Sequence, residues 1–215
     1  MRDYIIMTDS CCDLSQQEVE ELDLTVLPLS FTIEGKTLLN TPDHADMSPE
    51  EFFAKIAAGA DCTTAAVNVG QFTDAMEKVL QEGKDILYLS FSSGLSGTYN
   101  GSTIAAKDLM EKYPDARIIS IDTLAASIGE GLLVFAAAKK REEGLSLEEL
   151  AKWVEANRLH LCHWFTVDDL NHLKRGGRVS PAVAIIGTAL GIKPVMHVDD
   201  TGHLVPMSKA RGRRS

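Results

Sequence analysis

The stretch that decides the fold reads Asp85-Ile86-Leu87-Tyr88-Leu89-Ser90 and then Phe91-Ser92-Ser93-Gly94-Leu95-Ser96-Gly97-Thr98. Its first half is a short apolar run, which predicts a buried strand. Its second half is a loop of hydroxyl and glycine residues, and a helix is expected from there to Met110. A buried strand, a polar loop and a helix in this order are typical of an α/β protein with a parallel sheet.

The same order recurs on both sides of this stretch. Helix starts are expected at Ser48 and Ser146, because each serine is an N-cap residue followed three positions later by a glutamate. Further strands are predicted at residues 4–7, 24–29 and 117–122, and a further helix at 128–140. The pattern predicts a mainly parallel sheet that is covered by helices on both faces.

The pattern of predicted helices and strands changes after about Asn157. Asp199-Asp200-Thr201-Gly202 carries turn chemistry between two apolar segments and predicts a β-hairpin. A strand at 161–167, short helices at 167–174 and 181–190, and a strand at 193–197 are also expected. We therefore predict an α/β domain over residues 1–157, which carries the serine and threonine loops, and a smaller α+β domain over residues 158–215.

The length and the amino-acid composition indicate a protein with a sizeable core and without a membrane-spanning helix. The chain has 215 residues, 45% apolar and 24% charged, which is enough for a sizeable core. No stretch approaches the roughly 20 apolar residues of a membrane-spanning helix, and the N-terminus turns polar after Met7, so no signal peptide and no stable membrane insertion are expected. A cytoplasmic location is the expectation.

Charge argues against nucleic acid as a partner. The formal net charge is -10, and an acidic chain repels nucleic acid unless its basic residues cluster. They gather at residues 174–178 and in the tail at 209–214, which we interpret as a solvated, frayed end.

The cysteines and histidines predict neither disulfides nor a metal site. The neighbours Cys11 and Cys12 cannot easily bond each other, and no CxxC spacing occurs. Reduced thiols are expected at Cys11, Cys12, Cys62 and Cys162. His160 and His163 have no second ligand pair nearby in sequence, so no metal is expected.

Three polar segments follow apolar strands, at residues 8–10, 62–65 and 92–98. Ligands of parallel α/β sheets bind beyond the carboxyl ends of the strands, where such segments meet. In the third segment, backbone N–H groups and a helix N-terminus can face an anion. Serine, glycine and threonine also simply make turns and caps, and the residues alone leave both interpretations open.

The third segment matches neither of two well-known catalytic loops. It lacks the Gly-Lys-Ser/Thr ending of a phosphate-binding Walker A loop. Gly94-Leu95-Ser96-Gly97 also lacks the residue that separates serine from the second glycine in a nucleophile elbow. Asp9 and Asp122 are candidate general bases, although carboxylates at strand ends more often cap loops.

The glycine-arginine segment Lys174-Arg175-Gly176-Gly177-Arg178 is a second candidate for ligand binding. The Arg178 guanidinium could hold a carboxylate through two parallel hydrogen bonds. The alternative, which we favour from the residues, is that Arg178 ties its segment to Asp168, Asp169 or carbonyl oxygens of the neighbouring domain.

Taken together, these segments resemble the DegV family. The resemblance rests on Thr8-Asp9-Ser10, Thr64 before Gly70-Gln71-Phe72, the run 92–99, Phe165-Thr166-Val167-Asp168-Asp169-Leu170, Arg175–Ser180 and Gly191-Ile192-Lys193-Pro194, in the family's order along the whole chain. It implies two domains that bury a long-chain fatty acid between them. It also implies a non-enzymatic carrier without a cofactor, which presents the acid to a separate fatty-acid kinase for acyl phosphate formation and phospholipid synthesis.

The resemblance also implies site residues. The family's loop threonine matches Thr64, its paired loop serines match Ser92 and Ser93, and its motif arginine matches Arg178. The family usually has a serine where this chain has Ala65, and Thr63 is expected to compensate in part. The resemblance further implies a longer C-terminal domain with a ligand-binding histidine that has no counterpart here, so a truncated or partial second domain is expected.

An acyl chain would need an apolar lining. Candidates are Ile33, Ile128, Phe165, Ile185, Ile186 and Leu190, each of which could equally pack the core. The alternative function is a stand-alone phosphotransferase or hydrolase of a small anion, based on Asp9, Asp122 and the glycine-serine loop. A DNA-associated regulator that uses the basic tail is a third interpretation, disfavoured by the acidic net charge.

Overall fold

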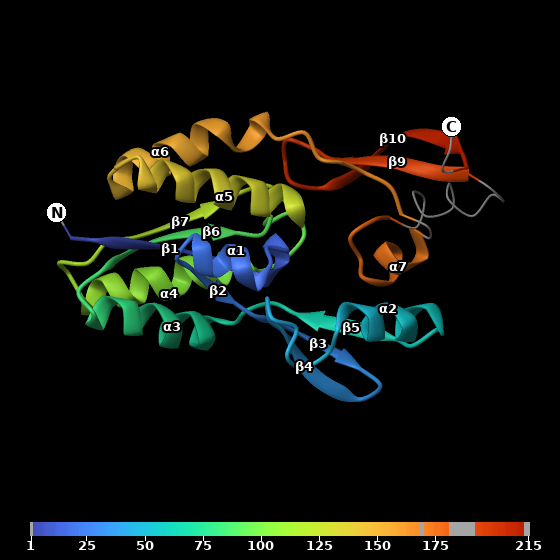
Figure 1. Ribbon diagram of the computed structural model, residues 1–215, viewed down its shortest axis with the longest axis horizontal. Coiled ribbons are helices and arrows are strands. Elements are labelled where there is room, and N and C mark those ends of the chain that lie inside the picture. The colour runs from blue at the N-terminus through green and yellow to red at the C-terminus, as the bar shows by residue number, and fades with distance from the viewer. Residues whose placement is uncertain (1, 168–169, 181–191, 213–215) are drawn as a thin grey trace.

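A computed structural model describes residues 2–167, 170–180 and 192–212. Within them the chain forms three sheets: a four-stranded parallel sheet and two three-stranded antiparallel sheets (Figure 1). The predicted α/β class with a smaller α+β C-terminal part is confirmed. Sheet C, formed after residue 157, contains strands β8, β9 and β10, and the division into two domains stays a prediction.

The parallel sheet, sheet A, has the strand order β2-β1-β6-β7. Its strands are β1 (Tyr4–Asp9), β2 (Leu24–Leu27), β6 (Asp85–Ser90) and β7 (Ile118–Asp122). All six residues of β6 are buried, which explains the continuous apolar run of the sequence. After β1 the chain first adds β2 on one side of β1 and later adds β6 on the other side, so the strand order reverses between β1 and β6. In open α/β sheets, ligands bind at such a reversal.

Helices cover both faces of sheet A, as predicted (Figure 1). Ile86 and Tyr88 pack against helices α3 (Val69–Gln81) and α4 (Thr98–Lys112). Leu87 and Leu89 point to the opposite face, because side chains alternate along a strand. There they pack against α5 (Ile128–Glu142) and α6 (Leu147–Asn157). The short elements η1 (Ser10–Cys12) and α1 (Gln16–Glu21) connect β1 to β2.

Sheet B corrects two predictions. It has the order β4-β3-β5, with β3 (Leu29–Ile33), β4 (Lys36–Asn40) and β5 (Cys62–Ala65), and α2 (Pro49–Ala57) lies between β4 and β5 in sequence. The single strand predicted at 24–29 is two strands in different sheets, because Pro28 interrupts the ladder. The segment 62–65, predicted as a loop, is a strand that pairs with β3.

Sheet C has the order β10-β9-β8, with β8 (Trp164–Phe165), β9 (Ile192–Val198) and β10 (Leu204–Arg211). The predicted hairpin is confirmed, but the strand expected at 161–167 is only two residues long. The 3-10 turn η2 (Arg158–His160) precedes it, and α7 (Leu170–Arg175) follows. The frayed end predicted for residues 209–214 is wrong at Lys209, Ala210 and Arg211, which pair with β9, and residues 213 and 214 lie outside the described residues. The predicted helix at 181–190 lies outside the described residues.

Helix α6 begins with the predicted capping box. The Ser146 side chain accepts from the Glu149 amide, and the Ser146 amide donates to the Glu149 carboxylate at 2.9 Å. Replacing Ser146 with alanine is expected to lower the free energy of unfolding by about 1 kcal/mol in urea denaturation, because one helix donor loses its acceptor. Ser146→Asp restores a capping oxygen and should recover most of this loss. An equal loss in both variants would contradict the capping role.

Candidate ligand-binding cavity

A cavity of about 1440 Å³ lies where the three sheets meet. It exceeds the roughly 300–1,000 Å³ that is usual for small-molecule sites. Residues of η1, sheet B, α2, the loop after β6, the start of α5 and the segment 161–178 line it. Phe91 at the end of β6 and Ser10 at the end of β1 both border it. The cavity therefore lies beyond the carboxyl ends of the parallel strands, as predicted.

One part of the cavity wall is apolar. The predicted lining residues Ile128 and Phe165 border it, and aliphatic and aromatic side chains of several elements join them: Leu29, Phe31, Phe52, Phe53, Leu132 and Leu173. Ile33 is only 1% exposed and is not among the described lining residues, so its predicted lining role is wrong. The predicted lining residues Ile185, Ile186 and Leu190 lie outside the described residues.

The loop Phe91–Gly97, called the serine loop below, joins β6 to α4. The backbone amides of Leu95 and Ser96 both donate to the Ser92 carbonyl at 3.1 Å, which makes the loop a tight turn. Ser96 and Gly97 line the cavity. The N-cap of α4 is Gly97, which provides no side-chain cap. The Thr98 amide donates to the Ser96 hydroxyl oxygen at 3.3 Å, and the next N–H groups of the first turn need an external acceptor, so this end of α4 is suited to an anion.

The two predicted serines of this loop have different surroundings. Ser92 is fully buried, and its hydroxyl donates to the Gly202 carbonyl at 2.8 Å. A hydroxyl has one proton to donate, so in this arrangement Ser92 cannot also donate to a ligand. Ser93 is exposed, and its amide donates to Asp122 at 3.1 Å. Neither serine is among the described lining residues of the cavity.

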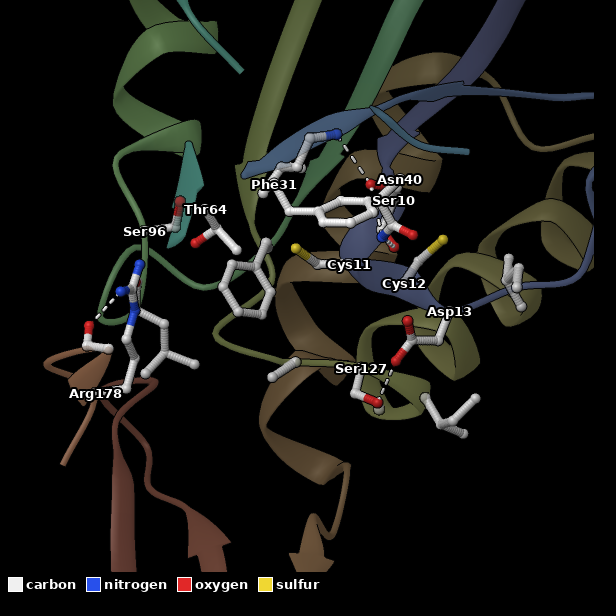
Figure 2. Close-up of a pocket in the computed structure, with 18 of the residues that line it drawn as sticks. Ser10, Cys11, Cys12, Asp13, Phe31, Asn40, Thr64, Ser96, Ser127 and Arg178 are labelled. Atoms are coloured by element: carbon white, nitrogen blue, oxygen red, sulfur yellow. Dashed lines mark hydrogen bonds between the residues drawn. The ribbon is translucent and has the colours of Figure 1, made fainter. Parts of the chain in front are cut away.

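Ser96 is the serine of this loop that reaches the cavity, and sequence reasoning did not single it out. Its hydroxyl lies 2.9 Å from the Thr98 hydroxyl. Figure 2 shows Ser96, Thr64 and Arg178 at the same end of the pocket. This end therefore combines two hydroxyls, a guanidinium and the start of α4.

Thr64 reaches this end from strand β5. It pairs with Phe31, and paired residues share a face of the sheet, so Thr64 lies on the face of sheet B that Phe31 turns to the cavity. Thr63 also borders the cavity, but it pairs with Thr32 on the opposite face. Ala65 is two residues from Thr63 and shares that opposite face. The serine hydroxyl that the resemblance implies for this position would therefore point away from Thr64.

Arg178 makes the structural contacts that the sequence favoured, and it also borders the cavity. Its Nε donates to the Leu95 carbonyl at 3.1 Å, and a terminal nitrogen donates to the Gly176 carbonyl. The guanidinium thus ties its segment to the serine loop. The predicted alternative partners Asp168 and Asp169 lie outside the described residues.

Cys11 and Cys12 also line the cavity, on the side where Figure 2 shows Asp13 and Ser127. Burial raises the pKa of both thiols, that of Cys12 to about 12. A thiol is nucleophilic only as the thiolate, so these cysteines are unsuited to covalent catalysis. All four cysteines are free, as predicted.

Asp9 and Asp122, the candidate general bases, instead have capping contacts. Asp9 is fully buried and accepts from the Tyr88 hydroxyl at 2.8 Å and the Phe91 amide at 3.0 Å. Burial raises the Asp9 pKa, and these hydrogen bonds oppose the rise. Asp122 accepts from the amides of Ser93 and Leu124. Neither aspartate is among the described lining residues.

Comparison with known proteins decides the family. A family profile described as "Uncharacterised protein, DegV family" matches residues 4–215. A DegV domain-containing protein of Clostridium perfringens is 46% identical over 214 residues, which cover 100% of this chain and 73% of the relative. The chain belongs to the DegV family.

Solved structures share the fold of this DegV protein. One, described as showing fatty acid binding of a DegV family protein from Thermus thermophilus, is 34% identical with a TM-score of 0.83, covering 99% of this chain and 72% of that one. Another, a stearic acid-binding protein from Eubacterium ventriosum, is 28% identical with a TM-score of 0.85, covering 98% and 71%.

Two features are absent from the described part of this DegV protein. No helix there has the length and apolar character needed to cross a membrane. No group of three or more histidine, cysteine, aspartate or glutamate side chains in the described ranges is arranged to hold a metal ion.

Proposed function

We propose that this DegV-family protein binds a long-chain fatty acid in the cavity, with the carboxylate at the end formed by Thr64, Ser96 and Arg178. The single observation that carries the proposal is a cavity whose wall joins this polar end to aliphatic and aromatic side chains. A polar end with hydrogen-bond donors and an apolar remainder match the two parts of a fatty acid. The fatty-acid-binding relatives in the family support the same ligand.

The acyl chain would supply most of the binding free energy. Each CH₂ group moved from water to an apolar surface contributes roughly 0.8 kcal/mol. The hydroxyls and the start of α4 then need only orient the carboxylate and keep it hydrogen-bonded in a low-dielectric site. Thr63 borders the same cavity, and Ser92 and Ser93 shape the loop that carries Ser96.

The proposed role is that of a carrier, which presents the bound acid to a separate fatty-acid kinase, where the acyl phosphate forms. The site offers poor support for the alternative, a stand-alone phosphotransferase or hydrolase. Its candidate bases Asp9 and Asp122 are at most 9% exposed and make capping hydrogen bonds, and the cavity thiols have raised pKa values. The ligand would lie between the parts formed by residues 1–157 and 158–215.

Native mass spectrometry of the gently purified protein tests the ligand. The expected result is a mass increment that corresponds to one long-chain fatty acid, released on denaturation. Protein freed of lipid should then bind palmitate or oleate in a titration. A protein that is empty as purified and binds neither acid would overturn the proposal.

Addition of a fatty-acid kinase and ATP tests the carrier role. Acyl phosphate should form only when this protein is present, and its formation without this protein would exclude the carrier role.

A further inference from the structure

The turn between β9 and β10, residues Asp199–His203, reaches across to the serine loop and is called the hairpin tip below. Its Gly202 is buried and accepts the hydrogen bond from the Ser92 hydroxyl at 2.8 Å. The same Ser92 oxygen accepts from the Gly94 amide at 3.2 Å. One buried hydroxyl thus joins the hairpin tip to the turn of the loop, over a sequence separation of 110 residues.

The fit between the two segments leaves no room for side chains. A Cβ on Gly202 would lie 2.0 Å from the Ser92 hydroxyl oxygen, and a Cβ on Gly94 would lie 2.8 Å from the Gly202 carbonyl oxygen. Gly202 also has a φ of +78°, which L side chains rarely adopt. Gly94 is therefore required by the close approach of the Gly202 backbone, and Gly202 by the Ser92 side chain that packs against it, and not only by the turns in which they lie.

The hairpin tip has its own internal support. One carboxylate oxygen of Asp199 accepts from the amides of Thr201 and His203, each at 2.9 Å, and from the Thr201 hydroxyl at 2.7 Å. Backbone hydrogen bonds from the Gly202 amide to the Asp199 carbonyl, and from the Asp199 amide to the His203 carbonyl, close the turn. Because these hydrogen bonds fix the conformation of the turn, the turn can hold a loop that packs against it in one conformation.

The serine loop is held by the N-terminal part as well. The Ser92 amide donates to the Ala125 carbonyl at 3.0 Å, and the Ser93 amide donates to Asp122. These bonds fix the start of the loop. Its middle, from Gly94 to Ser96, has contacts from the C-terminal part: the hairpin tip against Gly94, and Arg178 on the Leu95 carbonyl.

We propose that the hairpin tip positions the carboxylate site: through the Ser92–Gly202 contact it holds the serine loop in the conformation that turns Ser96 and the start of α4 toward the cavity. Ser92 and Gly202 are then positioning residues that act through Ser96. This inference rests on the proposed function, since the ligand whose headgroup is positioned is the fatty acid proposed above.

Competition binding with palmitate and methyl palmitate tests this inference, because the two ligands share the acyl chain and differ in the carboxylate. Ser92→Ala removes both hydrogen bonds of this hydroxyl, to the Gly202 carbonyl and from the Gly94 amide, and adds no atoms, and Gly202→Ala adds the clashing Cβ. Each variant is expected to weaken palmitate binding about tenfold, which corresponds to loss of the one hydrogen bond from Ser96 to the carboxylate, while methyl palmitate binding stays nearly unchanged. A merely structural loss would weaken both ligands alike.

Gly35→Ala is the matched control. Gly35 lies in the β3–β4 turn with a φ of +75°, and a Cβ there meets nothing within 4 Å, so it has the backbone strain without the clash. It should leave both affinities unchanged. Equal weakening of palmitate and methyl palmitate binding would overturn this inference and leave the proposed function standing. Unchanged palmitate binding in a folded Ser92→Ala variant would do the same. If Gly202→Ala does not fold, the result for Ser92→Ala decides. A wild-type protein that binds no palmitate overturns the proposed function, and the inference with it.

Discussion

Replacing Thr64 and Ser96 together with alanine is expected to weaken palmitate binding about 100-fold. Hydrogen bonds to a charged group contribute about 1.5–3 kcal/mol each, so two lost bonds correspond to about 3 kcal/mol, or roughly two orders of magnitude in the dissociation constant. The loss is expected to be large because the bonds lie in a partly apolar cavity, where an unpaired carboxylate is costly. The acyl chain keeps its contacts in the variant, so residual binding should persist.

Titration of lipid-free protein measures this effect. Thr25→Ala/Ser208→Ala is the matched control, because it removes one threonine and one serine hydroxyl from exposed strand positions that are not among the described lining residues. It should bind palmitate like the wild type. Methyl palmitate should bind both double variants equally. If Thr64→Ala/Ser96→Ala keeps wild-type palmitate affinity, the polar end has been assigned to the wrong residues.

The parts of the fold that the sequence predicted correctly are those with strong local signals. Strand β6 is fully buried and strands β1 and β7 are largely buried, so each is a nearly continuous apolar run that can be recognised without knowing its neighbours. Sheet B gave no such signal. Strand β5 has three exposed residues out of four and consists of small side chains, two of them threonine, which are also typical of a loop. Its strand character comes from pairing with β3, a tertiary contact.

In the candidate site as well, the features with a local sequence signal were predicted, whereas those that depend on contacts between distant residues were not. The sequence identified the serine loop and Thr64 as a candidate anion site, and both border the cavity. It could not decide which loop serine faces the cavity. Ser92 is not among the described lining residues, and its hydroxyl donates a hydrogen bond to the carbonyl of Gly202, which lies 110 residues further along the chain. No residue pattern around Ser92 contains this information.

Glu130 is a buried titratable residue that sequence reasoning did not predict. It stands in the first turn of α5, where an acidic residue is ordinary because it complements the helix dipole. In the structure it is fully buried, next to the end of β1. One carboxyl oxygen accepts from the Thr8 hydroxyl at 3.1 Å, and the other has no hydrogen-bond partner among the described residues. Burial, together with the nearby charge of Asp9, raises the Glu130 pKa well above its ordinary value.

This raised pKa predicts how stability depends on pH. Above the ordinary pKa of a glutamate, the unfolded chain loses the proton while the folded protein still holds it, so the folded state binds more protons. The free energy of unfolding must then fall as the pH rises, by up to about 1.4 kcal/mol per pH unit for one proton, until Glu130 ionises in the folded state. Glu130→Gln removes this proton and keeps the oxygen that accepts from Thr8.

The variant Glu130→Gln is therefore expected to gain stability relative to the wild type as the pH rises above the ordinary pKa of a glutamate, by up to about 1.4 kcal/mol per pH unit as long as the folded wild type keeps the Glu130 proton. Asp9, whose pKa is also raised by burial, should give both proteins a shared residual slope. Urea denaturation at several pH values measures the difference, and Glu155→Gln on the exposed face of α6 is the control. The control should follow the wild type at every pH. Parallel curves for Glu130→Gln and the wild type would mean that Glu130 ionises as freely in the folded protein as in water, which its complete burial and its unpaired oxygen oppose.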